Sequence, residues 1–137
     1  MLSAQIIELM EQVDNDFSPP LSKNINFELF AEKIINNSVI FQMCDKGILA
    51  GFVALYCNDF VNKTAFIPMI AIHTEYRRKG LALNLVNMAI QYAKDAGFEK
   101  ISLEVYKSNQ SAKKLYNKLG FSVIAENENS YVMSINL

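Results

Sequence analysis

The sequence has 137 residues, of which 51% are hydrophobic, 13 are basic and 14 are acidic. This apolar content is enough for the core of one compact domain, so we expect a single domain over residues 1–137. A net charge of −1 argues against an extended basic surface, and no apolar run approaches the roughly 20 residues that cross a bilayer. We therefore expect neither a nucleic-acid partner nor a membrane partner.

The two cysteines, Cys44 and Cys57, lie in apolar, strand-like stretches without the spacing of metal ligands. The chain begins without the charged and apolar segments of a secretion signal. These features predict reduced thiols, no metal site and a cytoplasmic location.

In chain order, hydrophobic spacing first predicts two helices, over Leu2–Val13 and Phe27–Ile35. Ser3 and Asn26 are the expected N-caps of these helices. Two successive prolines between them cannot continue a helix, so a loop is expected there.

From Val39 the apolar pattern changes to that of strands. Residues 39–44 and 48–57 are expected to form a hairpin through a short glycine-bearing turn, and residues 65–72 a third strand. Pro68 lies inside this third strand, where it predicts an edge position, a bulge or an interruption of the pairing.

The second half of the chain alternates between helix and strand patterns. The expected helices cover residues 80–96 and 110–119, and the expected strands cover residues 101–106, 121–125 and 131–135. The order α-α-β-β-β-α-β-α-β-β predicts an α/β (α+β) fold with a mixed central sheet flanked by helices. The passage from residue 65 to 106 implies a right-handed parallel crossover.

An anion site is predicted where the third strand leads into the third helix. Arg77, Arg78 and Lys79 directly precede Gly80 and the helix start. A helix N-terminus carries unpaired amides and partial positive charge, so cations there are unfavourable unless an anion binds. The alternative is a solvated loop decorated with charge. The spacing is that of neither a P-loop nor a dinucleotide fingerprint.

The run Arg77-Arg78-Lys79-Gly80-Leu81-Ala82 resembles the Arg/Gln-x-x-Gly-x-Gly/Ala motif of the GNAT family of N-acetyltransferases. A longer signature is matched by Leu103-Glu104-Val105, Asn109, Ala112, Leu115-Tyr116 and Leu119-Gly120-Phe121. The resemblance covers residues 48–137 well, and it implies the GNAT fold, acetyl-CoA as cofactor and a small-molecule amine as acceptor.

The resemblance also implies the cofactor contacts. The main chain of Ile70 and Ile72, with Ala71 between them, would pair with the pantetheine arm of the cofactor. The remaining implied contacts are Arg77, Arg78, Lys79, Gly80, Leu81 and Ala82 at the diphosphate, and Asn109, Ser111, Ala112 and Tyr116 on the following motif.

Two catalytic roles follow from the same resemblance. Tyr116 matches the family's general acid toward the departing thiolate, although a tyrosine at this spacing could also only pack on the helix face. Glu104 is the implied base, because the expected third strand has no acidic residue. Its alternative is a charged side chain that faces solvent from a strand.

The acceptor is expected to lie among the first helices, the proline loop, the turn over residues 58–64 and the last hairpin, with Phe17, Tyr56, Asn58, Asp59 and Tyr131 as lining residues. Residues 16–22 and 56–59 resemble acetyltransferases of bacterial surface-polysaccharide assembly, which implies an amino-sugar acceptor. A protein N-terminus is the competing acceptor, and a non-catalytic acyl-CoA-binding module is the competing function. The last hairpin is also a candidate contact for a homodimer.

Overall fold

All 137 residues are described by the computed structural model. Its six strands form one sheet in the order β1-β2-β3-β4-β6-β5. In chain order the elements are α1 (Leu2–Val13), η1 (Asp14–Asp16), η2 (Leu21–Lys23), α2 (Phe27–Asn37), β1 (Val39–Asp45), β2 (Ile48–Asp59), β3 (Thr64–Ile72), η3 (Thr74–Tyr76), α3 (Leu81–Asp95), β4 (Lys100–Tyr106), α4 (Gln110–Leu119), β5 (Ser122–Glu126) and β6 (Ser130–Asn136), where η marks a 3-10 helix.

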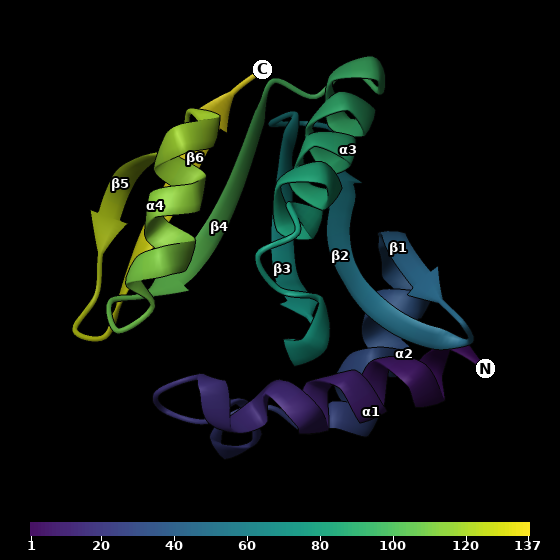
Figure 1. The fold of residues 1–137 in the computed structure, drawn as a ribbon. Coiled ribbons are helices and arrows are strands. Elements are labelled where there is room, and N and C mark those ends of the chain that lie inside the picture. The colour runs from purple at the N-terminus through teal and green to yellow at the C-terminus, as the bar shows by residue number, and fades with distance from the viewer.

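The predicted order of helices and strands is confirmed, and so is the mixed sheet. β3 and β4 are parallel, and every other neighbouring pair is antiparallel. Helices α3 and α4 lie on one face of the sheet, while α1 and α2 lie at its opposite side and lower end (Figure 1). Two apolar cores result, one between the sheet and α3 and α4, and the other between the sheet and α1 and α2.

Pro68 lies in a bulge of β3, as its position in the strand predicted. Phe66 pairs with Tyr56 and Met69 with Ala54, so β3 carries one more residue than β2 across this interval. The bulge changes which side chains face each core. Ala65 and Ile67 belong to the core of α3 and α4, whereas Met69 and Ala71 belong to the core of α1 and α2.

β3 and β4 separate immediately before this bulge. Their parallel pairing runs from Thr64 with Lys100 to Ile67 with Leu103 and then stops, although both strands continue. In Figure 1 the two strands diverge, and α1 with the loop that follows it passes beneath the opening. We call this opening between β3 and β4 the splay.

The helix starts divide into those with and those without a side-chain cap. Asn26 accepts a hydrogen bond from the Leu29 amide at 3.1 Å, so its predicted capping role is confirmed. The prediction for Ser3 is wrong, because α1 already begins at Leu2 and Met1 is its N-cap, without a side-chain bond. None of the helices has the length and apolarity that a membrane span requires.

Candidate active site

The β3 side of the splay offers main-chain groups to a ligand. The His73 amide donates to the Ala50 carbonyl at 2.8 Å, which marks this pair as hydrogen-bonded in the antiparallel ladder with β2. Because the two edges of a strand alternate, Ala71 also faces β2, whereas Ile70 and Ile72 turn their amides and carbonyls toward the splay. The sequence expectation for Ile70 and Ile72 thus agrees with the register, while the main-chain groups of Ala71 face away.

The β4 side follows the same rule. The Lys107 amide donates to the Asn129 carbonyl at 2.8 Å, so odd-numbered residues of β4 face β6. Glu104 therefore directs its amide and carbonyl toward the splay. Tyr106 directs its amide there, while its carbonyl accepts from the Asn109 amide at 2.9 Å. Main-chain amides and carbonyls strongly favour a hydrogen-bond partner. An extended molecule bearing amides would supply such partners to both β3 and β4.

The turn before α3, at the end of the splay, exposes main-chain amides of the kind that bind an anion. Gly80 is the N-cap of α3, with φ 76°, and no side chain caps this helix. The first helical bond runs from the Asn84 amide to the Gly80 carbonyl, so the amides of Leu81 and Ala82 have no partner within the helix. No atom lies within 4 Å of a Cβ built on Gly80, so a ligand can approach the backbone closely.

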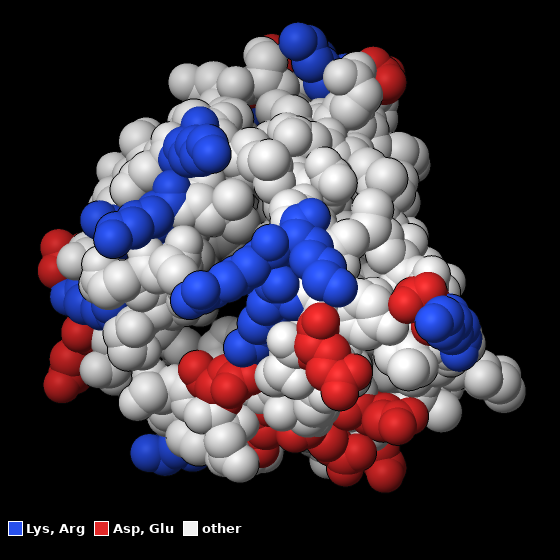
Figure 2. Space-filling view, in the orientation of Figure 1, with Lys and Arg blue, Asp and Glu red and all other residues white.

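Three exposed cations surround this helix start. Figure 2 shows Lys and Arg side chains gathered at the centre of this face, where α3 begins, beside a hollow in the surface. The Arg78 backbone adopts φ 63°, which is unfavourable for a residue with a Cβ. The Lys79 ammonium lies 5.4 Å from the centre of the Tyr76 ring.

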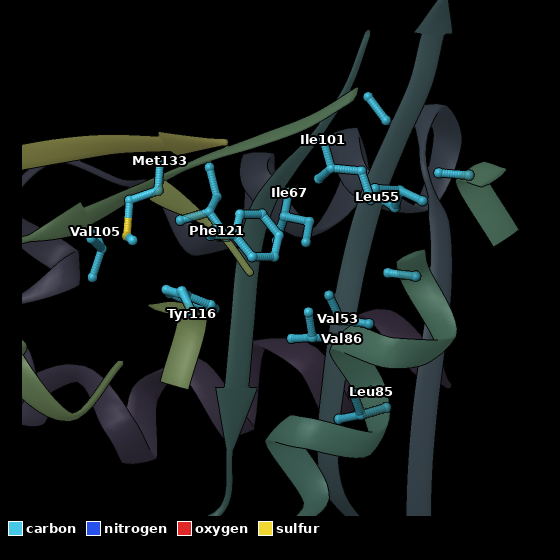
Figure 3. Close-up of a cluster of buried hydrophobic side chains, with 14 of the residues drawn as sticks. Val53, Leu55, Ile67, Leu85, Val86, Ile101, Val105, Tyr116, Phe121 and Met133 are labelled. Atoms are coloured by element: carbon cyan, nitrogen blue, oxygen red, sulfur yellow. The ribbon is translucent and has the colours of Figure 1, made fainter. Parts of the chain in front are cut away.

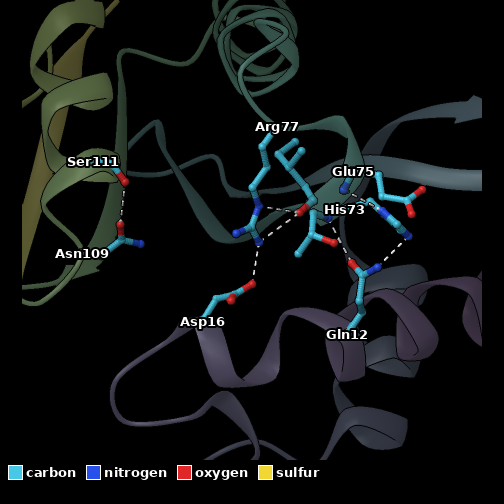
Figure 4. Close-up of polar contacts among 9 residues, drawn as sticks. Gln12, Asp16, His73, Glu75, Arg77, Asn109 and Ser111 are labelled. Carbon is cyan, nitrogen blue, oxygen red and sulfur yellow. Dashed lines mark hydrogen bonds and ion pairs between the residues drawn. The ribbon is translucent and has the colours of Figure 1, made fainter.

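Arg77 differs from its neighbours because its guanidinium has partners within the chain. Nη2 lies 2.7 Å from Asp16 Oδ2, and both Nε and Nη2 donate to the Ile72 carbonyl at 3.3 Å (Figure 4). The Tyr76 hydroxyl donates to Asp45 at 2.7 Å, which holds the preceding 3-10 helix against the β1–β2 turn. That hydrogen bond is also the main reason why the pKa of Tyr76 is raised.

Asn109 is the N-cap of α4. Its Oδ1 accepts hydrogen bonds from the Ala112 amide at 3.2 Å and from Ser111 Oγ at 3.4 Å. The capping role, which was the alternative to a cofactor contact, is therefore observed. Figure 4 shows Asn109 and Ser111 across the splay from Arg77.

Tyr116 lies on the face of α4 that packs against the sheet. Its side chain is in the core of α3 and α4, only 5% exposed, with its ring 5.7 Å from that of Phe121 (Figure 3). This burial raises the pKa of Tyr116 well above its ordinary value. The polar atoms that are sealed and unpartnered are Tyr56 Oη and Ser134 Oγ, so the Tyr116 hydroxyl, which has no partner in the chain, keeps contact with solvent.

Glu104 is held by two residues of the last hairpin. Ser130 Oγ donates to Glu104 Oε2 at 2.6 Å, and Asn127 Nδ2 donates to the same oxygen at 3.0 Å. Both bonds use Oε2, so Oε1 has no partner in the chain. Residues 126–130 lie between the last two strands that the sequence predicts, and nothing local indicated that two of them would contact the carboxylate.

Tyr116 and Glu104 lie on opposite faces of β4. Leu103 and Val105 point into the core that contains Tyr116, and the side chain between them must point the other way. A group held between β3 and β4 would therefore have the carboxylate on one side and the phenol on the other.

Most of the expected acceptor-lining residues are engaged elsewhere. Asn58 donates to the Asn37 carbonyl at 2.9 Å and Asp59 accepts from Asn62. Both residues lie at the end of β2, beside the end of β3 that is opposite Ile72. The Tyr131 ring is flanked by Lys107 and Lys113, at 5.3 and 5.0 Å from its centre. Phe17 alone of this set packs at the splay, with its ring 6.3 Å from that of Tyr106.

A second place that could hold a ligand does not coincide with this site. A hollow of about 550 Å³ lies beside α1 and is lined by Ile7, Glu11 and residues 22–28, none of them from the splay. No group of three or more His, Cys, Asp or Glu side chains is arranged to hold a metal ion.

Comparisons with known proteins identify the family of the chain. The model of the GNAT acetyltransferase family matches residues 6–121. N-alpha-acetyltransferase 30 of Schizosaccharomyces pombe is 29% identical over 118 residues, which are 83% of this chain and 75% of that protein. The chain spans only 25%, 42% and 42% of three other curated relatives, which are longer proteins.

Two solved structures share the fold over 98% of this chain, each with a TM-score of 0.79. One is the PaiA N-acetyltransferase of Thermoplasma acidophilum in complex with coenzyme A, which is 18% identical, and the match covers 92% of that protein. The other is the ribosomal-protein-S18-alanine N-acetyltransferase of Escherichia coli, 22% identical and covered to 86%. With the family model spanning most of the sequence, the chain belongs to the GNAT acetyltransferase family.

Proposed function

We propose that this protein is an acetyl-CoA-dependent N-acetyltransferase that acetylates a primary amine by direct attack. The observation that carries the proposal is the continuity of two features: main-chain groups along the splay that have no strand partner, and an uncapped, cation-rich helix start at its end. An amide-bearing arm joined to a diphosphate complements both features at once.

The residues around the splay match coenzyme A in their chemistry. Ile70 and Ile72 would pair with the amide-bearing arm, and the amides of Gly80, Leu81 and Ala82 would hold the diphosphate. Arg78 and Lys79 add positive charge at the same turn, and Asn109, Ser111 and Ala112 border the splay from α4. When bound, acetyl-CoA supplies a thioester whose acetyl carbon is open to attack by an amine.

Glu104 serves as the base in this proposal. Its Oε2 is fixed by Ser130 and Asn127, so the side chain is held in one orientation while Oε1 stays free to accept a proton from the attacking amine. A base whose position is fixed by neighbours needs little reorganisation when the proton moves.

Tyr116 serves as the acid that protonates the departing thiolate. Burial raises the pKa of the hydroxyl, so it stays protonated and has a proton to give. With acetyl-CoA bound, Tyr116 Oη would supply that proton to the sulfur of the leaving group. The amine would then approach from the face of β4 that carries Glu104, and the thiol would leave toward the face that carries Tyr116.

Direct attack is favoured over a covalent acyl-enzyme. Cys44 is exposed on β1, and Cys57 lies on β2, where burial raises the pKa of its thiol and disfavours the nucleophilic thiolate. Neither strand borders the splay.

For the acceptor we favour the α-amine of a polypeptide over the amino sugar expected from residues 16–22 and 56–59. One sequence relative is named as an N-alpha-acetyltransferase, and one protein of similar fold is named for acetylation of the alanine of ribosomal protein S18. In addition, Asn58 and Asp59, on which the amino-sugar expectation partly rests, lie at the end of β3 away from the splay.

The test is a thiol-release assay with acetyl-CoA and a panel of N-terminal peptides, amino sugars and polyamines, alongside calorimetry with coenzyme A. We expect saturable binding of coenzyme A, and thiol release only with peptides that have a free α-amine. Binding without release for any amine would favour a non-catalytic acyl-CoA-binding module. The absence of binding would overturn the proposal.

A further inference from the structure

Three consecutive residues after α1 contact both sides of the splay. Asp16 reaches the β3 side, where its carboxylate pairs with Arg77, whose guanidinium also donates to the Ile72 carbonyl. Phe17 and Ser18 reach the β4 side, where Phe17 packs edge-on against Tyr106.

The β4 contact is completed by a hydrogen bond over a long sequence separation. Ser108 Oγ, just after β4, donates to the Ser18 carbonyl at 2.8 Å. The loop that carries these contacts lies beneath the opening between β3 and β4 in Figure 1. β3 and β4 have no pairing of their own beyond Ile67 and Leu103, so nothing in the sheet fixes their separation at this end.

We propose that residues 16–18 form a strap that sets the width of the splay, and that Asp16, Arg77 and Ser108 are positioning residues of the site. The inference rests on the proposed function, because a fixed width matters only if an extended arm pairs between the strands. Main-chain pairing needs the strands at a defined spacing, about two strand separations of 4.7–4.9 Å apart.

The strap gives Arg77 a role different from that of a phosphate ligand. Its guanidinium is already divided between Asp16 and the Ile72 carbonyl, whereas Arg78 has no ion-pair partner. The two possible roles of Arg77 therefore predict opposite effects of Asp16→Asn on coenzyme A binding. If Arg77 binds phosphate, loss of the Asp16 charge frees it and tightens coenzyme A binding. If Arg77 anchors the strap, the same loss weakens binding.

The strap has two anchors, the Asp16–Arg77 ion pair and the Ser108–Ser18 hydrogen bond. Both are needed to hold it, because release of either end frees the strap. The Arg77–Asp16 pair has side chains 42% and 41% exposed, so its contribution is that of a surface ion pair. Such pairs and single hydrogen bonds correspond to factors of about two to five in an equilibrium constant. We expect Asp16→Asn and Ser108→Ala each to weaken coenzyme A binding by about that factor.

The experiment is a double-mutant cycle measured by calorimetry with coenzyme A. The double variant D16N/S108A should bind no more weakly than the weaker single variant, because the first substitution already frees the strap. The proposal would be contradicted if the fold losses of affinity in the two single variants multiplied in the double variant. Tighter binding of coenzyme A by Asp16→Asn would also contradict it. Glu75→Gln is the charge control, since Glu75 is exposed beside the turn and forms no ion pair, and Ser122→Ala is the hydroxyl control on exposed β5.

Hydrogen exchange in the ligand-free protein tests the strap without coenzyme A. We expect Asp16→Asn and Ser108→Ala each to accelerate amide exchange over residues 16–18 and over residues 72–77, while the two controls leave both segments unchanged. Unaltered exchange in these segments would overturn the strap. Failure of the wild-type protein to bind coenzyme A, together with accelerated exchange in the variants, would instead refute the proposed function and retain the strap.

Discussion

The substitution Tyr116→Phe separates a catalytic phenol from a packing residue. It removes one oxygen atom that has no hydrogen-bond partner in the chain, and it keeps the ring that packs against Phe121. The free energy of unfolding should therefore change by less than about 0.5 kcal/mol, in the range of substitutions that break no contact. A general acid contributes about 10²- to 10⁴-fold to the rate, so kcat should fall by that factor, or roughly 3–5 kcal/mol in the barrier.

The assay is steady-state thiol release with the denaturation midpoint measured on the same preparations. Tyr92→Phe is the matched control, because Tyr92 is 40% exposed on α3 and should lose neither activity nor stability. Because burial raises the pKa of Tyr116, the wild-type enzyme should show no loss of activity from phenol ionisation up to about pH 10. An unchanged kcat in Tyr116→Phe, or a kcat loss that parallels a loss of stability, would refute the acid role.

The other predictions concern the base and the phosphate turn. Glu104→Gln should keep the contacts to Ser130 and Asn127, lower kcat and shift or remove the acidic limb of the pH–rate profile; an unaltered limb would point to another base. Gly80→Glu should abolish measurable coenzyme A binding by calorimetry, whereas Gly80→Ala adds only a Cβ in open space and the strain of φ 76°; equal affinity in both variants would argue against an anion at this backbone. Arg78→Gly should not lower the unfolding midpoint, since it relieves φ 63°, yet it should weaken coenzyme A binding. A lower midpoint with unchanged affinity would make Arg78 structural.

The local features of the fold were readable from the sequence. The helix over residues 110–119 has the predicted bounds, Asn26 is the predicted cap, and Pro68 lies at the interruption that a proline in a strand implies. Each depends on a residue and its near neighbours, where helix periodicity, capping chemistry and the missing proline amide act directly.

The long-range contacts of the site were not readable. Asp16 meets Arg77 over a separation of 61 residues, and Ser130 meets Glu104 over 26. Such contacts are set by strand register and by where a loop crosses the sheet, and a single sequence carries no periodic signal for either. The same limit explains why Asn58 and Asp59 were expected near the acceptor, although they end β2 beside the far end of β3.

The cation run at the start of α3 shows how a local conflict can indicate function. Three positive side chains at a helix N-terminus oppose the helix dipole, and the fold resolves this for two of them within the chain, Arg77 by Asp16 and Lys79 by the Tyr76 ring. Arg78 has neither an ion-pair nor a ring partner and also keeps an unfavourable backbone conformation. Strain and unbalanced charge persist together in a folded protein when a ligand compensates for them, and a diphosphate on the free amides of Leu81 and Ala82 would compensate for both.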